Sequence, residues 1–144
     1  MNATLTYFIF TMNQEPFPIL VISSDEDDQV MFSEAIERIG PPAVCTNAFA
    51  CRKALADLLS GQIKPQLIFL DAYMDDMDGL ECLRFLKQHP QFSSIPVVML
   101  SGIDNEKIAL EAMQSGALHF YQKPVLFSQL LEMIKGTIPE VIQH

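Results

Sequence analysis

Four apolar residues followed by a carboxylate, Leu67-Ile68-Phe69-Leu70-Asp71, constrain the fold of this 144-residue chain more than any other stretch. Turn-forming residues flank the run, with Pro65 before it and Gly79 after it. A continuous apolar run between turn signals is typical of a strand buried on both faces of a parallel sheet. An acid at the carboxyl end of such a strand faces the crevice where open α/β sheets bind ligands. On this stretch alone, Asp71 is equally well explained as the cap of the turn that follows.

Similar short apolar runs alternate along the chain with stretches of helical periodicity. The predicted strands are residues 19–22, 43–46, 67–71, 96–100 and 117–122, and the second is the weakest. The predicted helices are residues 30–39, 50–60, 80–88, 105–114 and 126–135. Their expected buried positions are Val30, Phe32 or Ser33, Ile36 and Ile39 in the first helix, Leu55, Leu58 and Leu59 in the second, and Leu80, Leu83 and Leu86 in the third. Five alternating strand and helix segments imply a parallel sheet with helices on both faces.

Polar residues stand at the carboxyl ends of four predicted strands. Ser23 and Ser24 follow the first strand, Asp71 ends the third, Ser101 follows the fourth and Lys123 follows the fifth. Because the carboxyl ends of parallel strands meet at one edge of a sheet, we expect these side chains to form one site. An acid, hydroxyl groups and an ammonium gathered there are suited to hold an anionic group.

The composition excludes several classes of protein. Hydrophobic residues make up 49% of the chain, which argues against disorder. The formal net charge is −9, and no cluster of Lys and Arg provides the basic patch of a nucleic-acid-binding surface. The three cysteines form no C-x-x-C pair, which predicts reduced thiols in a cytoplasmic protein.

The first residues do not fit the alternating pattern. Residues 5–10 are apolar, but they lack a basic flank and are too short to span a bilayer, so we expect no signal peptide and no membrane anchor. Met12 is an alternative start of the natural chain, which the sequence does not decide. We predict that residues 1–15 are an extension that is mobile or packs on a neighbour, and that residues 16–144 form one domain.

Several motifs, in order and correctly spaced, resemble the receiver domain of two-component response regulators from about Pro18 to the end of the chain. They are Leu67-Ile68-Phe69-Leu70-Asp71 with Met77-Asp78-Gly79, then Val97-Val98-Met99-Leu100-Ser101-Gly102, then Gly116-Ala117, and finally Phe120-Tyr121-Gln122-Lys123-Pro124. The resemblance implies a flavodoxin-like (βα)5 fold, which is a doubly wound five-stranded parallel sheet with strand order 2-1-3-4-5.

The resemblance also assigns roles to individual positions. Asp71 matches the phosphoacceptor, a carboxylate nucleophile that takes a phosphoryl group from a partner histidine. Lys123 matches the lysine that pairs with this carboxylate, and Ser101 matches the hydroxyl that moves toward the phosphoryl group. Phe120 matches the aromatic switch residue, although it is also explained as a plain core residue. The backbone carbonyl of Tyr73 falls where the family supplies a metal ligand, as Asp71 itself does.

One position departs from the family. The first strand of a receiver normally ends in two acids that hold Mg²⁺, and here Ser23-Ser24 stand in their place as degenerate ligands. Mg²⁺ prefers carboxylates, so we expect it to bind weakly, if at all. A longer first strand would make Asp25-Glu26 the acid pair, and Asp75 adds a carboxylate where the family commonly has Pro. With fewer acids nearby, Asp71 and Lys123 are expected to form a direct ion pair.

Enzymes and calcium sites fit the sequence less well. An EF-hand calcium loop with its glycine at Gly79 would have its first ligand at Met74 and its last at Phe85. Neither side chain carries an oxygen that could bind calcium. A haloacid-dehalogenase-type phosphatase needs an acid where Tyr73 stands. A flavin-binding loop after the first strand would contain Gly, and four acids follow Ser23-Ser24 instead. We therefore expect no enzyme.

The sequence leaves two functions open. The first is a stand-alone receiver in a phosphorelay, which accepts a phosphoryl group on Asp71 from a sensor histidine kinase or phosphotransfer protein and acts on a downstream protein target. The second is a pseudo-receiver, a docking module that keeps the fold without efficient phosphorylation because of Ser23-Ser24. Neither involves nucleic acid or membrane, and the oligomeric state is undecided.

Overall fold

Five parallel strands form a single sheet in the order β2-β1-β3-β4-β5 in the computed structural model, which describes residues 2–12 and 15–143. The strands are β1 (Phe17–Ile22), β2 (Ala43–Ala48), β3 (Leu67–Asp71), β4 (Val97–Ser101) and β5 (His119–Gln122). The sheet confirms the predicted fold class and strand order. The central strands β3 and β4 are buried at every position, as a strand covered on both faces must be.

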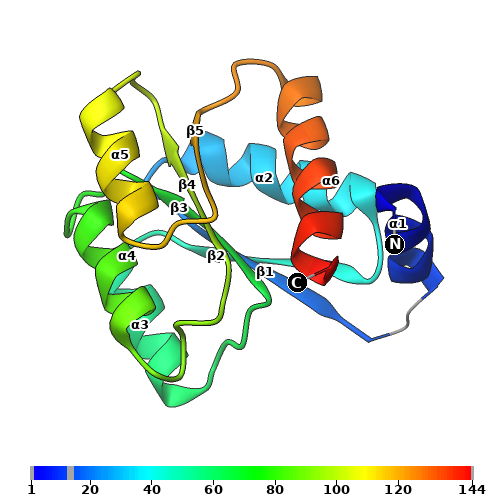
Figure 1. The fold of residues 1–144 in the computed structure, drawn as a ribbon, viewed down its shortest axis with the longest axis horizontal. Helices are drawn as coiled ribbons and strands as arrows, with labels where there is room; N and C mark the ends of the chain where they lie inside the picture. Colours follow the sequence, from blue (N-terminus) through cyan, green and yellow to red (C-terminus); the bar gives the residue numbers. More distant parts are fainter. Residues whose placement is uncertain (1, 13–14, 144) are drawn as a thin grey trace.

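Helices cover both faces of the sheet (Figure 1). They are α1 (Ala3–Met12), α2 (Glu26–Ile39), α3 (Cys51–Ser60), α4 (Gly79–Gln88), α5 (Glu106–Gln114) and α6 (Phe127–Gln143). α3, α4 and α5 lie on one face, whereas α2 and α6 lie on the other. In the described part of the chain, no helix has the length and apolar character needed to cross a membrane.

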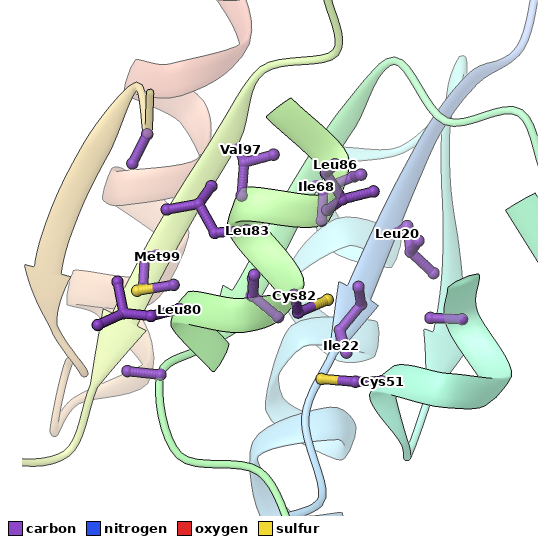
Figure 2. Packing of buried hydrophobic residues seen from close by; sticks show 14 of the residues in the cluster. Leu20, Ile22, Cys51, Ile68, Leu80, Cys82, Leu83, Leu86, Val97 and Met99 are labelled. Carbon is purple, nitrogen blue, oxygen red and sulfur yellow. The ribbon is translucent and has the colours of Figure 1, made fainter. Parts of the chain in front are cut away.

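Side chains of the central strands β1, β3 and β4 alternate between two cores. On the face of α3 and α4, Leu20, Ile68 and Met99 pack against Leu83 and Leu86 (Figure 2). The opposite core contains the intervening strand residues Ile19, Val21, Leu67, Phe69 and Val98, together with Ile36 of α2 and Ile134 of α6. This alternation follows from the two-residue period of a strand, and it explains why the strands read as continuous apolar runs.

Short polar residues cap three of the helices that follow the carboxyl edge of the sheet, α2, α4 and α5. Asp25 accepts a hydrogen bond from the Asp28 N–H (3.0 Å), and Asp78 accepts one from the Leu80 N–H (3.0 Å). Asn105 caps α5 in the same way. Each cap satisfies amides that lack partners inside the helix, so it fixes where the helix starts relative to the strand before it.

Four of the predicted helical details are wrong. The first predicted helix begins at Glu26 and not at residue 30, since Asp25 caps it. Val30 and Leu59 are exposed, because the buried stripes run instead through Gln29, Phe32, Ala35 and Ile36 in α2 and through Cys51, Ala54 and Leu58 in α3. The last helix also continues beyond residue 135 to Gln143, through Pro139. Buried contacts of Ile134, Thr137 and Ile138 extend it and outweigh the lost backbone hydrogen bond at proline.

Residues 3–12 form a helix, which the sequence did not predict. Phe10 is buried and meets Phe17 edge to face, with ring centroids 5.3 Å apart. The Gln143 amide of α6 donates to the Thr6 hydroxyl (3.0 Å), so α1 packs against α6. The mobility of this segment and the boundary at residue 16 stay predictions.

Candidate functional site

The carboxyl edge of the sheet carries a cavity of about 380 Å³ beside Asp71. It is lined by Ser24, Asp25, Asp71, Tyr73, Asp75, Gly102, Ile103 and Lys123. These residues follow β1, β3, β4 and β5, so the strand ends meet as predicted from the parallel topology. Asp71 itself is 5% exposed, the last residue of the buried strand β3.

Lys123 is shared between two carboxylates. Its Nζ lies 2.7 Å from Asp71 Oδ2, which gives the direct ion pair that the sequence predicts, and 2.5 Å from Asp28 Oδ2. Burial acts to lower the pKa of Lys123, but the hydrogen bonds to Asp28 and Asp71 outweigh it and raise the pKa above its ordinary value. The ammonium is therefore the resident positive charge of the site.

The two serines after β1 have different contacts. The Ser23 hydroxyl is buried, donates to Asp71 Oδ2 (3.2 Å) and accepts a hydrogen bond from the Asp25 N–H. The Ser24 hydroxyl accepts a hydrogen bond from the Asp75 N–H (3.1 Å), which ties β1 to the loop after β3. Asp25 caps α2, and β1 ends at Ile22, so the longer first strand with Asp25-Glu26 as the acid pair is wrong.

The remaining predicted residues surround Asp71 without all contacting it. The Tyr73 N–H donates to Asp71 Oδ1 (3.1 Å), and the Tyr73 side chain is exposed beside the cavity. The buried Ser101 hydroxyl donates to the Ile103 carbonyl oxygen (2.7 Å). Phe120 is partly buried against the core on the α3–α4 face, a position compatible with both a core role and a switch role.

Two sets of hydrogen bonds hold the loop between β3 and α4 in place. Asp76 accepts hydrogen bonds from the N–H groups of Cys51 (3.0 Å) and Arg52 (2.8 Å), and so caps α3, whose own N-cap residue Ala50 provides no side-chain bond. These backbone bonds outweigh desolvation and lower the pKa of Asp76. The Gly79 N–H donates to the Ala72 carbonyl oxygen (3.1 Å), and this bond closes the loop where α4 begins.

Two residues of α2 that were not predicted from the sequence support the site. Asp28 contacts Lys123, and Gln29 is 2% exposed although it is polar. The Gln29 amide donates to the carbonyl oxygens of Val21, Ser23 and Ala48, at 2.9–3.1 Å. A glutamine in the apolar stripe of a helix was the available signal for this bond network, because a buried amide needs partners.

The donor set does not fit a strong Mg²⁺ site. Among residues 2–12 and 15–143, no three Asp, Glu, His or Cys side chains form a group suited to a metal ion. Asp71 Oδ2 is already bonded to Lys123 and Ser23, and the Ser24 hydroxyl is bonded to the loop. Because Mg²⁺ requires near-octahedral oxygen ligands and favours carboxylates, neutral hydroxyls with other partners replace the acids poorly.

Residues 19–135 match the family described as the response regulator receiver domain. The chain is 31% identical over 126 residues to the sensory transduction protein BceR of Halalkalibacterium halodurans, which covers 87% of this chain and 51% of BceR. It is 26% identical over 126 residues to the polar-differentiation response regulator DivK of Brucella anthropi, which covers 84% of this chain and 95% of DivK. The chain spans only about half, or less, of the length of the first curated relatives that it matches.

Solved structures of response regulators share the fold. The Mn(2+)-bound form of response regulator Rcp1 superposes with a TM-score of 0.77 at 25% identity, covering 84% of this chain and 91% of Rcp1. The phosphorylated cyanobacterial phytochrome response regulator RcpA gives a TM-score of 0.78 at 26% identity, covering 85% of this chain and 91% of RcpA.

Proposed function

Because the chain belongs to the family of response regulator receiver domains, we propose that it accepts a phosphoryl group on Asp71 and passes the signal on through protein contacts. The observation that best supports this proposal is the Asp71–Lys123 ion pair at the edge of an open cavity. The donor is a phosphohistidine of a sensor kinase or phosphotransfer protein. The downstream target is another protein, and the chain itself is a signalling module without enzymatic turnover of its own.

The chemistry is a displacement at phosphorus. A carboxylate oxygen of Asp71 attacks the phosphorus atom, the P–O bond forms, the P–N bond to the donor imidazole breaks, and the imidazole takes up a proton as it leaves. Negative charge on the moving phosphoryl oxygens must be neutralised, and Lys123 is the cation that already lies beside Asp71. The Tyr73 N–H holds the other carboxylate oxygen and orients the nucleophile.

Incubation with a small phosphodonor tests this proposal. We expect the parent protein to gain one phosphoryl group slowly, as detected by intact mass measurement, and the Asp71→Asn variant to gain none. Asp57→Asn, which removes the partner of Lys53 in an ion pair of α3, is the matched control and should accept the group as the parent does. A parent that gains no mass from any donor, with Mg²⁺ or without, contradicts phosphoryl acceptance.

One observation favours the second candidate function. Ser23 and Ser24 stand where the family has its metal-binding acids, and both hydroxyls have other hydrogen-bond partners. A pseudo-receiver that docks its target without phosphorylation would tolerate this change. It predicts that Asp71→Asn binds the target as well as the parent does, whereas the phosphorylation-driven switch predicts that a phosphodonor changes target binding only in the parent.

A phosphorylated form should be long-lived. Tyr73 and Ile103 both line the cavity with large, exposed side chains, which obstruct a water molecule that approaches the phosphorus atom. We expect Tyr73→Ala to lose its phosphoryl group several-fold faster than the parent, as followed by intact mass over time. Tyr73→Phe keeps the bulk and should stay slow, so equal rates for the alanine and phenylalanine variants would count against shielding.

A further inference from the structure

We infer that Asp28 is a positioning residue of the phosphoacceptor site, holding the Lys123 ammonium beside Asp71 from the first turn of α2. The inference rests on the proposed function, since it concerns how Asp71 is prepared for phosphorylation. Lys123 Nζ bonds to Asp28 Oδ2 at 2.5 Å and to Asp71 Oδ2 at 2.7 Å. Two of its three N–H groups therefore point at carboxylates that come from different elements.

The anchor at Asp28 is itself fixed. The Asp28 N–H donates to the Asp25 carboxylate, so its place in the first turn of α2 is set by the cap. The next residue, Gln29, bonds to backbone carbonyls at the ends of β1 and β2, which stops α2 from sliding along the sheet. Asp28 is thus held in place by the same strand end that leads to Ser23.

Charge around the ammonium explains why a second acid matters. Asp25 and Asp75 line the same cavity, but within the described chain the acids in ion pairs with Lys123 are Asp28 and Asp71. A lysine has a long, flexible stem, and a single partner leaves its head free to move around that partner. Shared between two fixed acids, the ammonium stays at one side of Asp71, close to where the phosphoryl oxygens develop charge. This placement matters because the rate of phosphoryl transfer falls steeply when a catalytic group is displaced.

Two alanine variants separate this role from a general charge effect. Asp28→Ala and Asp27→Ala remove the same charge from adjacent positions of α2, but Asp27 is exposed and lies outside the ion pairs of Lys123. We expect Asp28→Ala to be phosphorylated about tenfold more slowly than the parent, and Asp27→Ala to match the parent. Asp28→Glu restores a carboxylate and should recover part of the rate.

The position of Lys123 is read separately, without any phosphodonor. Hydrogen-bonded ammonium protons exchange slowly with water, so the ¹⁵N resonance of Lys123 should show faster proton exchange in Asp28→Ala and unchanged exchange in Asp27→Ala. Melting temperatures of all variants establish that the fold is intact. A parent that is never phosphorylated overturns the proposed function. A phosphorylated parent with an equally fast Asp28→Ala, an Asp28→Glu as slow as Asp28→Ala, or unchanged Lys123 exchange overturns the role of Asp28.

Discussion

Replacing Ser23 and Ser24 together by aspartate is expected to turn a protein that Mg²⁺ barely stabilises into one that Mg²⁺ stabilises strongly. Ser23 already contacts Asp71, and Ser24 lies on the wall of the same cavity, so two acids at these positions would face the Asp71 carboxylate. Without metal, the added like charges lower the melting temperature, because close carboxylates repel. The lost hydrogen bond from Ser23 to Asp71 adds to this cost.

With Mg²⁺ present, the two added aspartates are expected to raise the melting temperature and no longer to lower it. A ligand that binds only the folded state raises the free energy of unfolding by about 2.7 kcal/mol at a hundred times its dissociation constant. For a chain of this length, that corresponds to a rise in Tm of roughly 8 °C. The measurement is Tm against Mg²⁺ concentration for the parent and the double variant, with Na⁺ at equal ionic strength to separate screening from binding.

The chain offers a matched control for this experiment. Ser93 and Ser94 form an exposed Ser-Ser pair in the loop before β4, at the amino-terminal edge of the sheet. Their double aspartate variant adds the same charge without a metal site, so it should show no specific response to Mg²⁺. A parent that already responds as strongly as the Ser23→Asp/Ser24→Asp variant would mean that Asp25 or Asp75 completes a working site, and the pseudo-receiver interpretation would fail.

A single added methyl group at Gly79 should destabilise the protein by about 3 kcal/mol, at the upper end of the usual cost of overpacking. A Cβ at this position would lie 2.5 Å from the Asp71 carbonyl oxygen and 2.6 Å from the Ala72 carbonyl oxygen. Both are backbone atoms, which cannot turn away as a side chain can. α4 therefore begins in contact with the backbone of Asp71 and Ala72, and only glycine fits between them.

Gly136→Ala provides the opposite expectation. Gly136 lies inside α6, and a Cβ there would meet nothing within 4 Å, so alanine should stabilise by about 0.5–1 kcal/mol through its better helix propensity. Urea unfolding of both variants measures the difference. We also expect Gly79→Ala to accept phosphoryl groups more slowly, because the loop that holds Tyr73 must move. A Gly79→Ala variant as stable as the parent would show that the loop shifts at no cost.

The sequence predicted the sheet well because its signals are local. The runs at β1, β3 and β4 are apolar at nearly every position, and this pattern identifies central parallel strands without any knowledge of their neighbours. The order of the strands then brings Ser23, Asp71 and Lys123 to one edge. The strand ends were predicted less well. β1 begins at Phe17 and not at residue 19, β2 continues to Ala48 and does not end at residue 46, and β5 begins at His119 and not at residue 117.

The parts of the site that escaped prediction depend on long-range packing. Asp28 is one of three acids in the first turn of α2, where acids are common because they favour the helix dipole. Its contact with Lys123 joins residues 95 positions apart and follows only from how α2 lies on the sheet. The hydrogen bond that the Ser24 hydroxyl accepts from the Asp75 N–H could not be predicted either, because the sequence does not show where that loop returns.

The Asp76 cap of α3 links that helix mechanically to the loop that follows Asp71. Five residues after Asp71, one carboxylate occupies two amides at the start of α3, and the N-cap residue Ala50 has no side chain that could replace it. A loop that rearranges must therefore either pull the first turn of α3 along with it or leave two helix amides to water. Either way, a rearrangement of the loop after Asp71 would be transmitted to α3, the helix beside the edge strand β2.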